Sequence, residues 1–476
     1  MNIDEYTTYD ALGLAELVAR GDTTAAELAE VARSAAEQVN TQLNAIAGYV
    51  EPGVSGDAED GARFVGVPTL MKDLGAGIAG VKQEMGSRLT ADHVTEMTSY
   101  FAQRMLDAGF NVIGRTTCPE FGLTLTTESI AVGQTANPWN TEHICGGSSG
   151  GSAAMVAAGV VPLAHTNDGG GSTRIPASIC GNVGLKTSRG RVSLFPAMND
   201  VSGPLVVEGC NSRTVRDTAA FLDAVAGAAP GEATLLPHPE GSYLEGLANR
   251  QTYRIALSLD PWGSAEMDGD IRTEMERIGG VLRDLGHTVE LVTPDVLKDG
   301  SVTHSFKVLW FALAQLSAVG FSAVTNRQPG PDTLEPTTLA MVAEGAKLTA
   351  LDFNMAIAHS NIVGRHLGGF FNEWDLMLTP TLNRPTPKLG SGITLHAGNT
   401  LDEWYHEALA VVPHTPVANF TGLPAISVPC GVGPGDMPLG AHFFAGMGEE
   451  TVLLDVAAQL EEADPWRDRR PAVFAS

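Results

Sequence analysis

The chain has 476 residues, of which 43% are hydrophobic, so it can bury a large core and global disorder is excluded. Its net charge of −26 argues against a nucleic-acid partner, because phosphates require a basic surface. The acidic residues are scattered rather than clustered, which indicates a polar surface that weakly favours neutral or cationic small molecules.

The five cysteines are an odd number without a CxxC spacing, which favours reduced thiols and a cytoplasmic location. The N-terminal residues are acidic and lack the basic start and apolar run of a signal peptide. No run of about 18 uninterrupted apolar residues occurs, so we expect neither a membrane-spanning helix nor a membrane partner.

The first third of the chain alternates helices with strands. Two helices are predicted within residues 10–40, because Thr24 and Glu27 have the spacing of a capping box and apolar residues recur with a helical period. The other predicted elements are strands at residues 44–50, 65–70, 111–114 and 160–164 and helices at 97–110 and 152–158.

The alternation continues to the end of the chain. A connector is predicted at residues 229–243, and residues 303–372 are predicted to be mainly helical with an interruption near 328–332. Further predictions are helices at 214–228, 270–285 and 450–462 and strands at 254–259, 287–292, 374–378, 425–429 and 439–445. Apolar strands between helices indicate an α/β fold with helices on both faces of a sheet.

Two glycine- and serine-rich clusters occur within residues 146–193, and the second of them favours acyl-transfer chemistry. Ser172 follows Asp168 and three consecutive glycines, whose backbone N–H groups can converge on one point and bind an anion. A serine hydroxyl beside such donors suits a nucleophile that generates an oxyanion. A flexible or phosphate-binding glycine loop is the alternative.

A serine nucleophile also needs a base. Lys72 ends a predicted buried strand, and a lysine drawn into a dry site loses its proton more easily than a solvated one. A solvated lysine at a strand end is the alternative. In the first cluster, Ser148 and Ser149 lie between two glycine pairs. They can relay a proton or cap the helix expected to begin near Ser152.

The segments GGSSGGS, NDGGGSTRIPA and CGNVGLKTSRGRVS closely resemble the amidase signature family. The resemblance implies a Ser–Ser–Lys triad with Lys72 as the base, Ser148 on a cis peptide as the bridging serine, and Ser172 as the nucleophile. It further implies an oxyanion hole and a supporting set. The oxyanion donors would be the backbone N–H groups of Gly169, Gly170, Gly171 and Ser172, and the supporting residues would be Ser149, Asp168 and Arg174.

The likeness covers most of residues 10–465. The PxAHxND run, RIPAS and DPWRDRRP are most similar to the branch of 6-aminohexanoate cyclic-dimer (nylon oligomer) hydrolases. The resemblance implies the amidase signature fold, a central mixed β-sheet covered by helices on both faces. One domain would span residues 1–476, with a signature core at about 60–215 and a variable helical substrate region at about 295–415. Neither a cofactor nor a metal is implied, and a homodimer is compatible with the sequence.

The implied activity is that of a serine hydrolase that cleaves carbon–nitrogen bonds of apolar, non-peptide amides through an acyl-enzyme. Side activity on esters and carbamates is expected, and a urethanase that acts mainly on carbamates is the alternative.

Two positions depart from the family pattern. Gly169 stands where many members have a bulky aliphatic residue, and Asn167 where many have threonine. We expect them to loosen the loop or to widen the acyl side of the pocket.

Several apolar residues are candidates for contacting the substrate, with ordinary core packing as the alternative for each. If they line the cleft, an apolar substrate is favoured over a charged one. These candidates are Phe121, Leu123, Thr124, Trp310 and Phe311.

Two competing interpretations remain. Residues 146–150 also fit GxSxG, which would make Ser148 the nucleophile of an α/β-hydrolase-type esterase with His442 as its base. That interpretation leaves the GGGS cluster and Lys72 unexplained. The second is a binding protein that keeps the fold but has lost catalysis, and the presence of all three triad positions argues against it.

Overall fold

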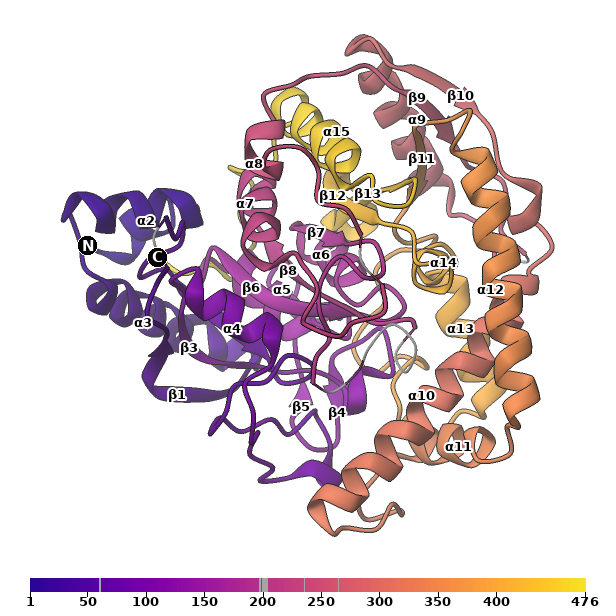
Figure 1. Cartoon of the computed structure of the whole chain (residues 1–476), viewed down its shortest axis with the longest axis horizontal. Helices are drawn as coiled ribbons and strands as arrows, with labels where there is room; N and C mark the ends of the chain where they lie inside the picture. The colour runs from indigo at the N-terminus through magenta and orange to yellow at the C-terminus, as the bar shows by residue number, and fades with distance from the viewer. Residues whose placement is uncertain (60, 197, 199–203, 235, 264) are drawn as a thin grey trace.

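The computed structural model describes residues 1–476 except residues 60, 197, 199–203, 235 and 264 (Figure 1). The strands are β1 Ile46–Ser55, β2 Pro68–Lys72, β3 Asn111–Thr116, β4 Glu128–Ser129, β5 Gly133–Gln134, β6 Leu163–Asp168, β7 Val183–Lys186, β8 Val207–Ser212, β9 Arg254–Leu257, β10 Thr288–Leu291, β11 Leu376–Pro380, β12 Ala425–Val432 and β13 Pro438–Ala445.

Fifteen α-helices and four short 3-10 turns are found in the described residues. The helices are α1 Ile3–Tyr6, α2 Ala11–Arg20, α3 Ala25–Leu43, α4 Tyr100–Asp107, α5 Gly150–Ala157, α6 Arg174–Cys180, α7 Val215–Val225, α8 Tyr243–Gly246, α9 Gly269–Asp284, α10 Ser301–Thr325, α11 Pro336–Gly345, α12 Ala350–Phe370, α13 Leu401–Val411, α14 Thr415–Thr421 and α15 Glu450–Ala463. The 3-10 turns are η1 Arg88–Thr90, η2 Glu120–Gly122, η3 Asp295–Leu297 and η4 Pro434–Asp436.

The predicted alternation of strands and helices is found, with shifted boundaries. The capping box of Thr24 and Glu27 opens α3 as expected. Strand β2 begins three residues later than predicted and ends at Lys72, and β6 continues past the predicted end to Asp168. Helices α6, α13 and α14 and strands β4, β5, β7 and β8 were not predicted. Apart from α13, which has 11 residues, each of these is short. Strands β7 and β8 also contain glycine or polar residues that hide the apolar pattern.

An eight-stranded mixed sheet forms the centre, in the order β10-β9-β11-β13-β12-β7-β8-β6. Strands β9, β10 and β11 are parallel, and the remaining pairs are antiparallel. Because side chains alternate along a strand, the two faces of β12 contact different helices. Ile426 and Val428 belong to the core that includes α15, whereas Ser427 lies beside Gly440 and Ser178 of α6. Helices therefore cover both faces, as predicted.

The strand that carries Lys72 belongs to a separate three-stranded sheet, in the order β1-β3-β2. Strands β2 and β6 belong to different sheets, and hydrogen bonds that involve side chains join them. The backbone N–H of Lys72 donates to Nδ1 of His165 at 3.2 Å, and Thr69 Oγ1 donates to the carbonyl of Leu163 at 2.9 Å. These bonds set β2 alongside the first half of β6, and the Lys72 side chain reaches Asn167 near the end of β6, next to the glycine cluster.

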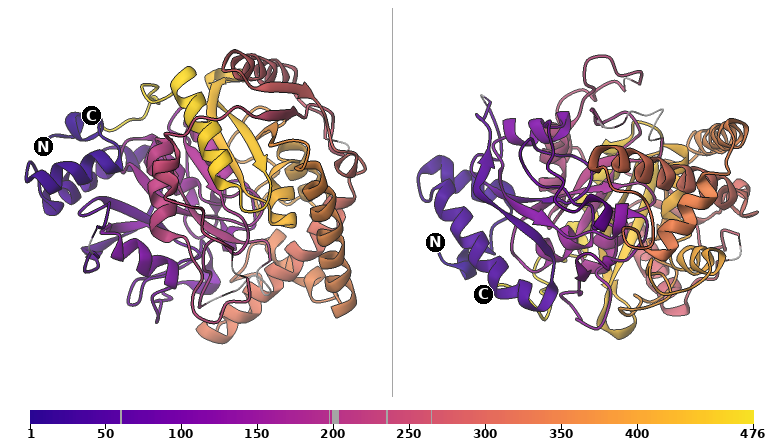
Figure 2. Two further views of the ribbon diagram at one scale, coloured as in Figure 1. Left: turned by 45° about the horizontal axis from the view of Figure 1, so that its top comes forward. Right: turned by 90° about the horizontal axis from the view of Figure 1, so that it is seen from below.

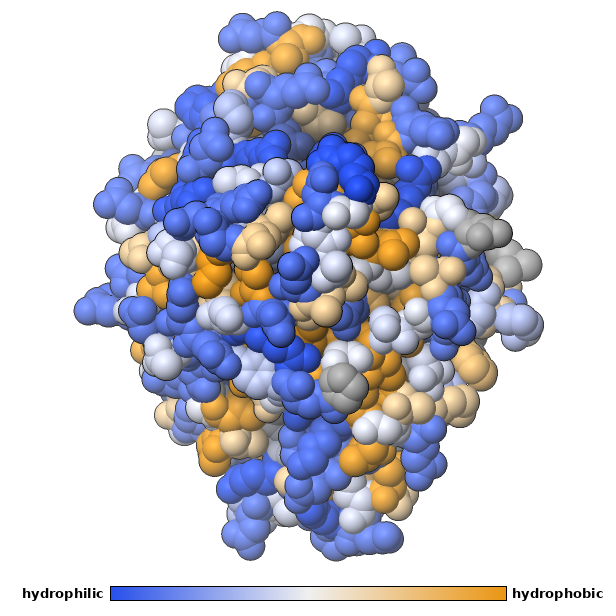
Figure 3. All heavy atoms as spheres, turned by 90° about the vertical axis from the view of Figure 1, so that its left-hand side faces the viewer, coloured by the Kyte–Doolittle hydropathy of each residue, from blue (hydrophilic) through white to orange (hydrophobic). Residues whose placement is uncertain are grey.

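The helical segment α10–α12 lies on the side of the molecule opposite the N-terminal helices α2 and α3 (Figures 1 and 2). By length and composition alone, α10 is the one described helix long and apolar enough to cross a membrane, and 28% of its most apolar window is buried. Helix α10 packs against α11, α12 and α14. On the face formed by the N-terminal part, hydrophilic side chains cover much of the surface (Figure 3).

Four phenylalanines join the N-terminal sheet to α4 and α7. Phe64 stacks on Phe110 with ring centroids 4.4 Å apart, and Phe221 of α7 meets Phe110 and Phe101 edge to face at 6.0 and 5.9 Å. Phe101 in turn contacts the ring of His165, with centroids 5.6 Å apart. The cluster therefore supports the histidine that binds the backbone of Lys72.

We expect Phe221→Ala to lower the free energy of unfolding by about 3–5 kcal/mol, because it removes a buried aromatic ring and leaves a cavity. Leu291→Ala is the matched control, since Leu291 is 68% exposed, and it should change stability by no more than about 0.5 kcal/mol. Urea denaturation followed by tryptophan fluorescence measures both. Equal losses in the two variants would contradict this account of the core.

Candidate active site

Two cavities meet at Ser172. The larger, of about 270 Å³, is lined by Ser148, Ser172 and Asn167 among others, and the smaller, of about 60 Å³, also includes Ser172. Phe121 lines the larger cavity, whereas Leu123 and Thr124 line the smaller one. Trp310 lines both.

Lys72 is fully enclosed between the two sheets. Its Nζ lies 2.7 Å from Ser148 Oγ and 2.6 Å from Oδ1 of Asn167. Burial lowers the pKa of Lys72 to about 8, an effect that the carboxylates of Glu208 and Asp168 partly oppose. A substantial fraction of this lysine is therefore neutral at mildly alkaline pH and can accept a proton.

Ser148 follows a cis peptide bond after Gly147, in the loop that opens α5. The loop passes too close to its neighbours for larger residues. A Cβ at Gly147 would lie 2.7 Å from the backbone of Leu125, and one at Gly150 would lie 2.3 Å from Oγ1 of Thr127. The glycines on both sides of the serine pair are therefore required by the close approach of the chain.

Ser149 joins the two glycine clusters. Its backbone N–H donates to the carbonyl of Ser172 at 3.3 Å, and its hydroxyl donates to the carbonyl of Asn167 at 3.2 Å. Helix α5 begins at Gly150, two residues earlier than predicted, and Ser149 occupies its N-cap position without a side-chain capping bond. The alternative role of this serine as a helix cap is therefore not found.

The glycine loop follows directly from the end of β6. The backbone N–H of Gly171 donates to Oδ1 of Asp168 at 2.7 Å, which corrects its expected role as an oxyanion donor. In the part of the chain that the structure describes, the N–H groups of Gly169, Gly170 and Ser172 have no hydrogen-bond partner. Three of the four predicted donors are therefore free to bind an anion.

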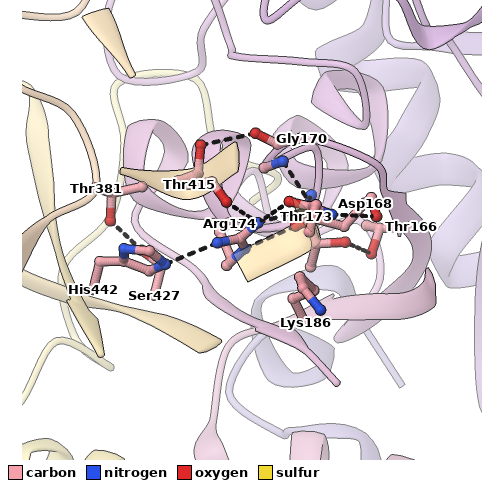
Figure 4. Close-up of polar contacts among 12 residues, drawn as sticks. Thr166, Asp168, Gly170, Thr173, Arg174, Lys186, Thr381, Thr415, Ser427 and His442 are labelled. Atoms are coloured by element: carbon pink, nitrogen blue, oxygen red, sulfur yellow. Dashed lines mark hydrogen bonds and ion pairs between the residues drawn. The ribbon is translucent and has the colours of Figure 1, made fainter. Parts of the chain in front are cut away.

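A buried ion pair holds this loop in place (Figure 4). Arg174 donates from Nε to one oxygen of Asp168 at 2.9 Å and from a terminal nitrogen to the other at 3.0 Å. The same guanidinium binds the carbonyl of Thr415 at 2.9 Å, Oδ1 of Asn419 at 2.7 Å and Nε2 of His442 at 2.9 Å. The loop is thereby tied to α14 and β13.

In this network the Asp168 carboxylate stays charged, whereas the His442 ring stays neutral. Burial by itself raises the pKa of Asp168, but the Arg174 guanidinium overcomes it and holds this pKa at about 2. Burial and the positive charge of Arg174 keep the pKa of His442 well below its ordinary value. Because a guanidinium only donates, Nε2 of neutral His442 accepts, and its Nδ1 lies 3.1 Å from Thr379 Oγ1.

The position of His442 bears on the GxSxG alternative. Both of its ring nitrogens are engaged, one by Arg174 and one by Thr379, and Ser148 instead contacts Lys72. The geometry therefore does not provide His442 as a base for Ser148.

The absent side chain of Gly169 does not open the pocket as expected. A Cβ at Gly169 would lie 3.3 Å from the indole of Trp310, and one at Gly170 would lie 3.1 Å from the ring of Phe306. These two aromatic rings stack with centroids 5.4 Å apart and fill the space over the loop. Phe311, by contrast, packs against Tyr405 and lines neither of the two cavities at Ser172.

Four polar residues at the site had no assigned role in the sequence-based prediction. Asn167 was noted only as a departure from the family pattern, yet it binds Lys72 directly. His165 positions the backbone of Lys72, Thr415 Oγ1 donates to the carbonyl of Gly170 at 2.8 Å, and Asn419 donates to Asp168 at 2.9 Å. Alternation along β6 could have placed His165 and Asn167 on one face. Nothing in the sequence links Thr415 or Asn419 to a loop some 245 residues earlier.

Comparisons with known proteins identify the family and the fold. The family model described as Amidase matches residues 15–454. A 6-aminohexanoate-cyclic-dimer hydrolase from Paenarthrobacter ureafaciens is 36% identical, over 98% of this chain and 97% of its own length. The solved structure of a 6-aminohexanoate cyclic dimer hydrolase complexed with substrate has a TM-score of 0.92 at 33% identity and covers 98% of this chain and 99% of its own. A bacterial aryl acylamidase of the amidase signature family has a TM-score of 0.84 at 26% identity and covers 96% of both chains.

We expect Arg174→Met to lower the free energy of unfolding by about 3–5 kcal/mol, because it leaves the Asp168 carboxylate buried without its cation. Adding Asp168→Asn to Arg174→Met should recover part of this loss, since the buried charge is then removed. Urea denaturation of the two single variants and the double variant measures the coupling. Strictly additive losses would show that the two side chains do not depend on each other.

Proposed function

Because this chain belongs to the amidase family, as an amidase signature hydrolase that acts on carbon–nitrogen bonds other than peptide bonds, we propose that it forms an acyl-enzyme on Ser172. In this proposal Lys72 is the base, and Ser148 passes the proton between the lysine and the nucleophile. The observation that carries the proposal is the buried contact of 2.7 Å between Lys72 Nζ and Ser148 Oγ, in the wall of the cavity that also contains Ser172.

The hydrogen bonds of Lys72 favour a proton relay in one direction. A neutral amine has two N–H bonds and one lone pair. One N–H donates to Oδ1 of Asn167, whose own position is fixed by a bond of 2.9 Å from Nδ2 to the carbonyl of Leu74. The lone pair can then accept the Ser148 proton while Ser148 accepts the proton of Ser172.

The remaining steps follow from the same geometry. Ser172 Oγ attacks the substrate carbonyl, and the negative charge on the oxygen is stabilised by the free N–H groups of Gly169, Gly170 and Ser172, each worth about 3–4 kcal/mol in such a site. Ser148 returns the proton to the leaving nitrogen, and the carbon–nitrogen bond breaks. Water then hydrolyses the acyl-enzyme by the reverse relay, which releases a carboxylic acid and restores Ser172.

We propose small, apolar, non-peptide amides as the substrates. The cavity walls near Ser172 include Phe121, Leu123 and Trp310, and the relatives named above include hydrolases of the 6-aminohexanoate cyclic dimer. We further propose one catalytic domain over residues 1–476, in which the core at about 60–215 supplies the triad and the helical region at about 295–415 shapes the pocket. Esters and carbamates present the same carbonyl and leaving group, so side activity on them is expected, and a urethanase is the second candidate.

An activity-based fluorophosphonate probe should label the wild-type protein at Ser172. We expect Ser172→Ala to abolish labelling and amide hydrolysis, and Lys72→Ala to lower both by at least about a thousandfold, because the relay loses its base. Mass spectrometry of the labelled peptide locates the adduct, and thermal unfolding confirms that each variant is folded. Labelling at Ser148 that survives Ser172→Ala would overturn the assignment in favour of the GxSxG alternative. No labelling and no turnover of any amide, ester or carbamate would favour a binding protein.

The pH dependence should report the lysine. The base must be neutral, so kcat/KM for an uncharged amide should rise with pH, reach half its maximum near the Lys72 pKa of about 8, and fall about tenfold per pH unit well below it. A solvated lysine would place the midpoint more than two pH units higher. The residual activity of Lys72→Ala should not show this rise of kcat/KM with pH. A rate that is flat between pH 6 and 9 in the wild-type protein would show that Lys72 is not the base.

A further inference from the structure

Among the described residues that line the larger cavity, Glu208 is the only aspartate, glutamate, lysine or arginine. The rest of the lining is mostly apolar and includes Leu74, Met85, Phe121 and Trp310. The side chain of Glu208 is only 6% exposed. Burying a carboxylate in an apolar wall costs free energy unless N–H or O–H groups donate hydrogen bonds to it. The donors that each oxygen of Glu208 has, or lacks, therefore show what this side chain is suited to bind.

Strand pairing sets Glu208 next to the relay. Strands β6 and β8 are antiparallel, and Glu208 lies directly opposite Asn167 in their register. Asn167 in turn binds Lys72 Nζ at 2.6 Å. The negative charge of Glu208 is near enough to raise the pKa of Lys72 against the effect of burial. Glu208 is therefore a neighbour of the proposed chemistry, and its described hydrogen bond goes to His165 and not to either serine.

His165 uses one oxygen of this carboxylate. Nδ1 of His165 accepts the backbone N–H of Lys72 at 3.2 Å, so in the neutral ring the proton is on Nε2. Nε2 lies 2.9 Å from Oε2 of Glu208 and donates to it. The histidine thus holds the carboxylate in one orientation and leaves the second oxygen, Oε1, available.

Oε1 of Glu208 has no hydrogen-bond partner within the described ranges of the chain. It faces Gly75, where a Cβ would lie 2.6 Å from Oε1 and 2.2 Å from Nδ2 of Asn167. Gly75 has a φ of +94°, and it lines the same cavity. Only glycine fits there, because a side chain would collide with the carboxylate, while Glu208 itself lines the cavity with this oxygen still lacking a donor.

We propose that Oε1 of Glu208 binds a hydrogen-bond donor of the substrate, an ammonium or a second amide N–H, on the amine portion of the scissile amide. This inference rests on the proposed function. Ser148, which returns the proton to the leaving nitrogen, opens into the larger cavity, whereas the smaller cavity is lined by Gly147 and not by Ser148. The amine portion of the substrate therefore extends toward Glu208. Its apolar spacer packs on the cavity wall, and a carboxylate at its end is repelled.

The test compares matched substrates in one assay. N-(aminoalkyl)hexanamides with propyl to hexyl spacers carry a terminal ammonium, and N-alkylhexanamides of the same length carry a methyl in its place. We expect the wild-type protein to favour the ammonium series at the best spacer length by at least about tenfold in kcat/KM, as a charge-assisted hydrogen bond provides. The matching carboxylate-terminated amides should be the poorest substrates. Released hexanoic acid, measured by chromatography, gives the rates.

Two variants of Glu208 test whether this side chain causes the ammonium preference, and a third variant, at Glu290, is the control. Glu208→Gln keeps the size of the side chain and can still accept from His165, so the preference should fall to about twofold or less and the carboxylate series should improve. Glu208→Asp keeps the charge on a shorter side chain, so the preference should persist with a longer best spacer. Glu290→Gln removes one charge from the exposed face of β10, far along the sheet, and should leave the preference unchanged.

The outcomes separate this inference from the proposed function. Turnover of the neutral amides and of p-nitrophenyl hexanoate without an ammonium preference would overturn the role of Glu208 and leave the proposed function standing. An equal preference in the wild-type protein and Glu208→Gln would also overturn it, since the charge would act from elsewhere. If neither the neutral amides nor the ester are hydrolysed, the proposed function itself fails.

Discussion

The carboxylate of Asp168 is the group on which the geometry of the site depends. It stands at the last position of β6, and it binds the N–H of Gly171 while it receives two hydrogen bonds from Arg174. Without it, the N–H of Gly171 would lose its partner, and the loop would be held by Thr415 at the Gly170 carbonyl and by Ser149 at the Ser172 carbonyl. Because Arg174 also binds α14 and β13, the loop is set by elements from across the whole chain. The oxyanion donors that we propose are therefore held rigid before any substrate arrives.

Two ionisable groups near this loop are driven in opposite directions by their surroundings. Asp168 touches a guanidinium and keeps its charge, with a pKa of about 2. Lys72 is equally buried, but its Nζ is hydrogen-bonded among the described residues to a hydroxyl and an amide oxygen and not to a carboxylate, so burial prevails and its pKa falls to about 8. Groups whose surroundings separate their pKa values in this way are typical of acid–base sites. The same contrast explains why Asp168 suits a structural role and Lys72 a chemical one.

The sequence predicted the fold class, most of the longer elements and the proposed triad, because these depend on local pattern and on family motifs. The boundaries of β2 and β6 were displaced, since both strands run into polar or glycine-rich residues that an apolar pattern does not include. The loss of Gly171 as an oxyanion donor could not be predicted, because it depends on the rotamer of Asp168. The contacts of Thr415 and Asn419 were missed for a similar reason, as they depend on how distant helices pack.

Shape and charge at the larger cavity come from different parts of the molecule. Trp310 projects from α10 over Gly169, so a larger residue at this loop position would collide with its indole ring. A change in α10 can therefore reshape the pocket while the contacts of Lys72 stay intact. Glu208 differs, because it lies in the core on β8 and its negative charge raises the pKa of Lys72. Replacing Glu208 with a neutral residue to suit another substrate would also lower the pKa of Lys72. This one side chain therefore links substrate selectivity to the pH range of the reaction.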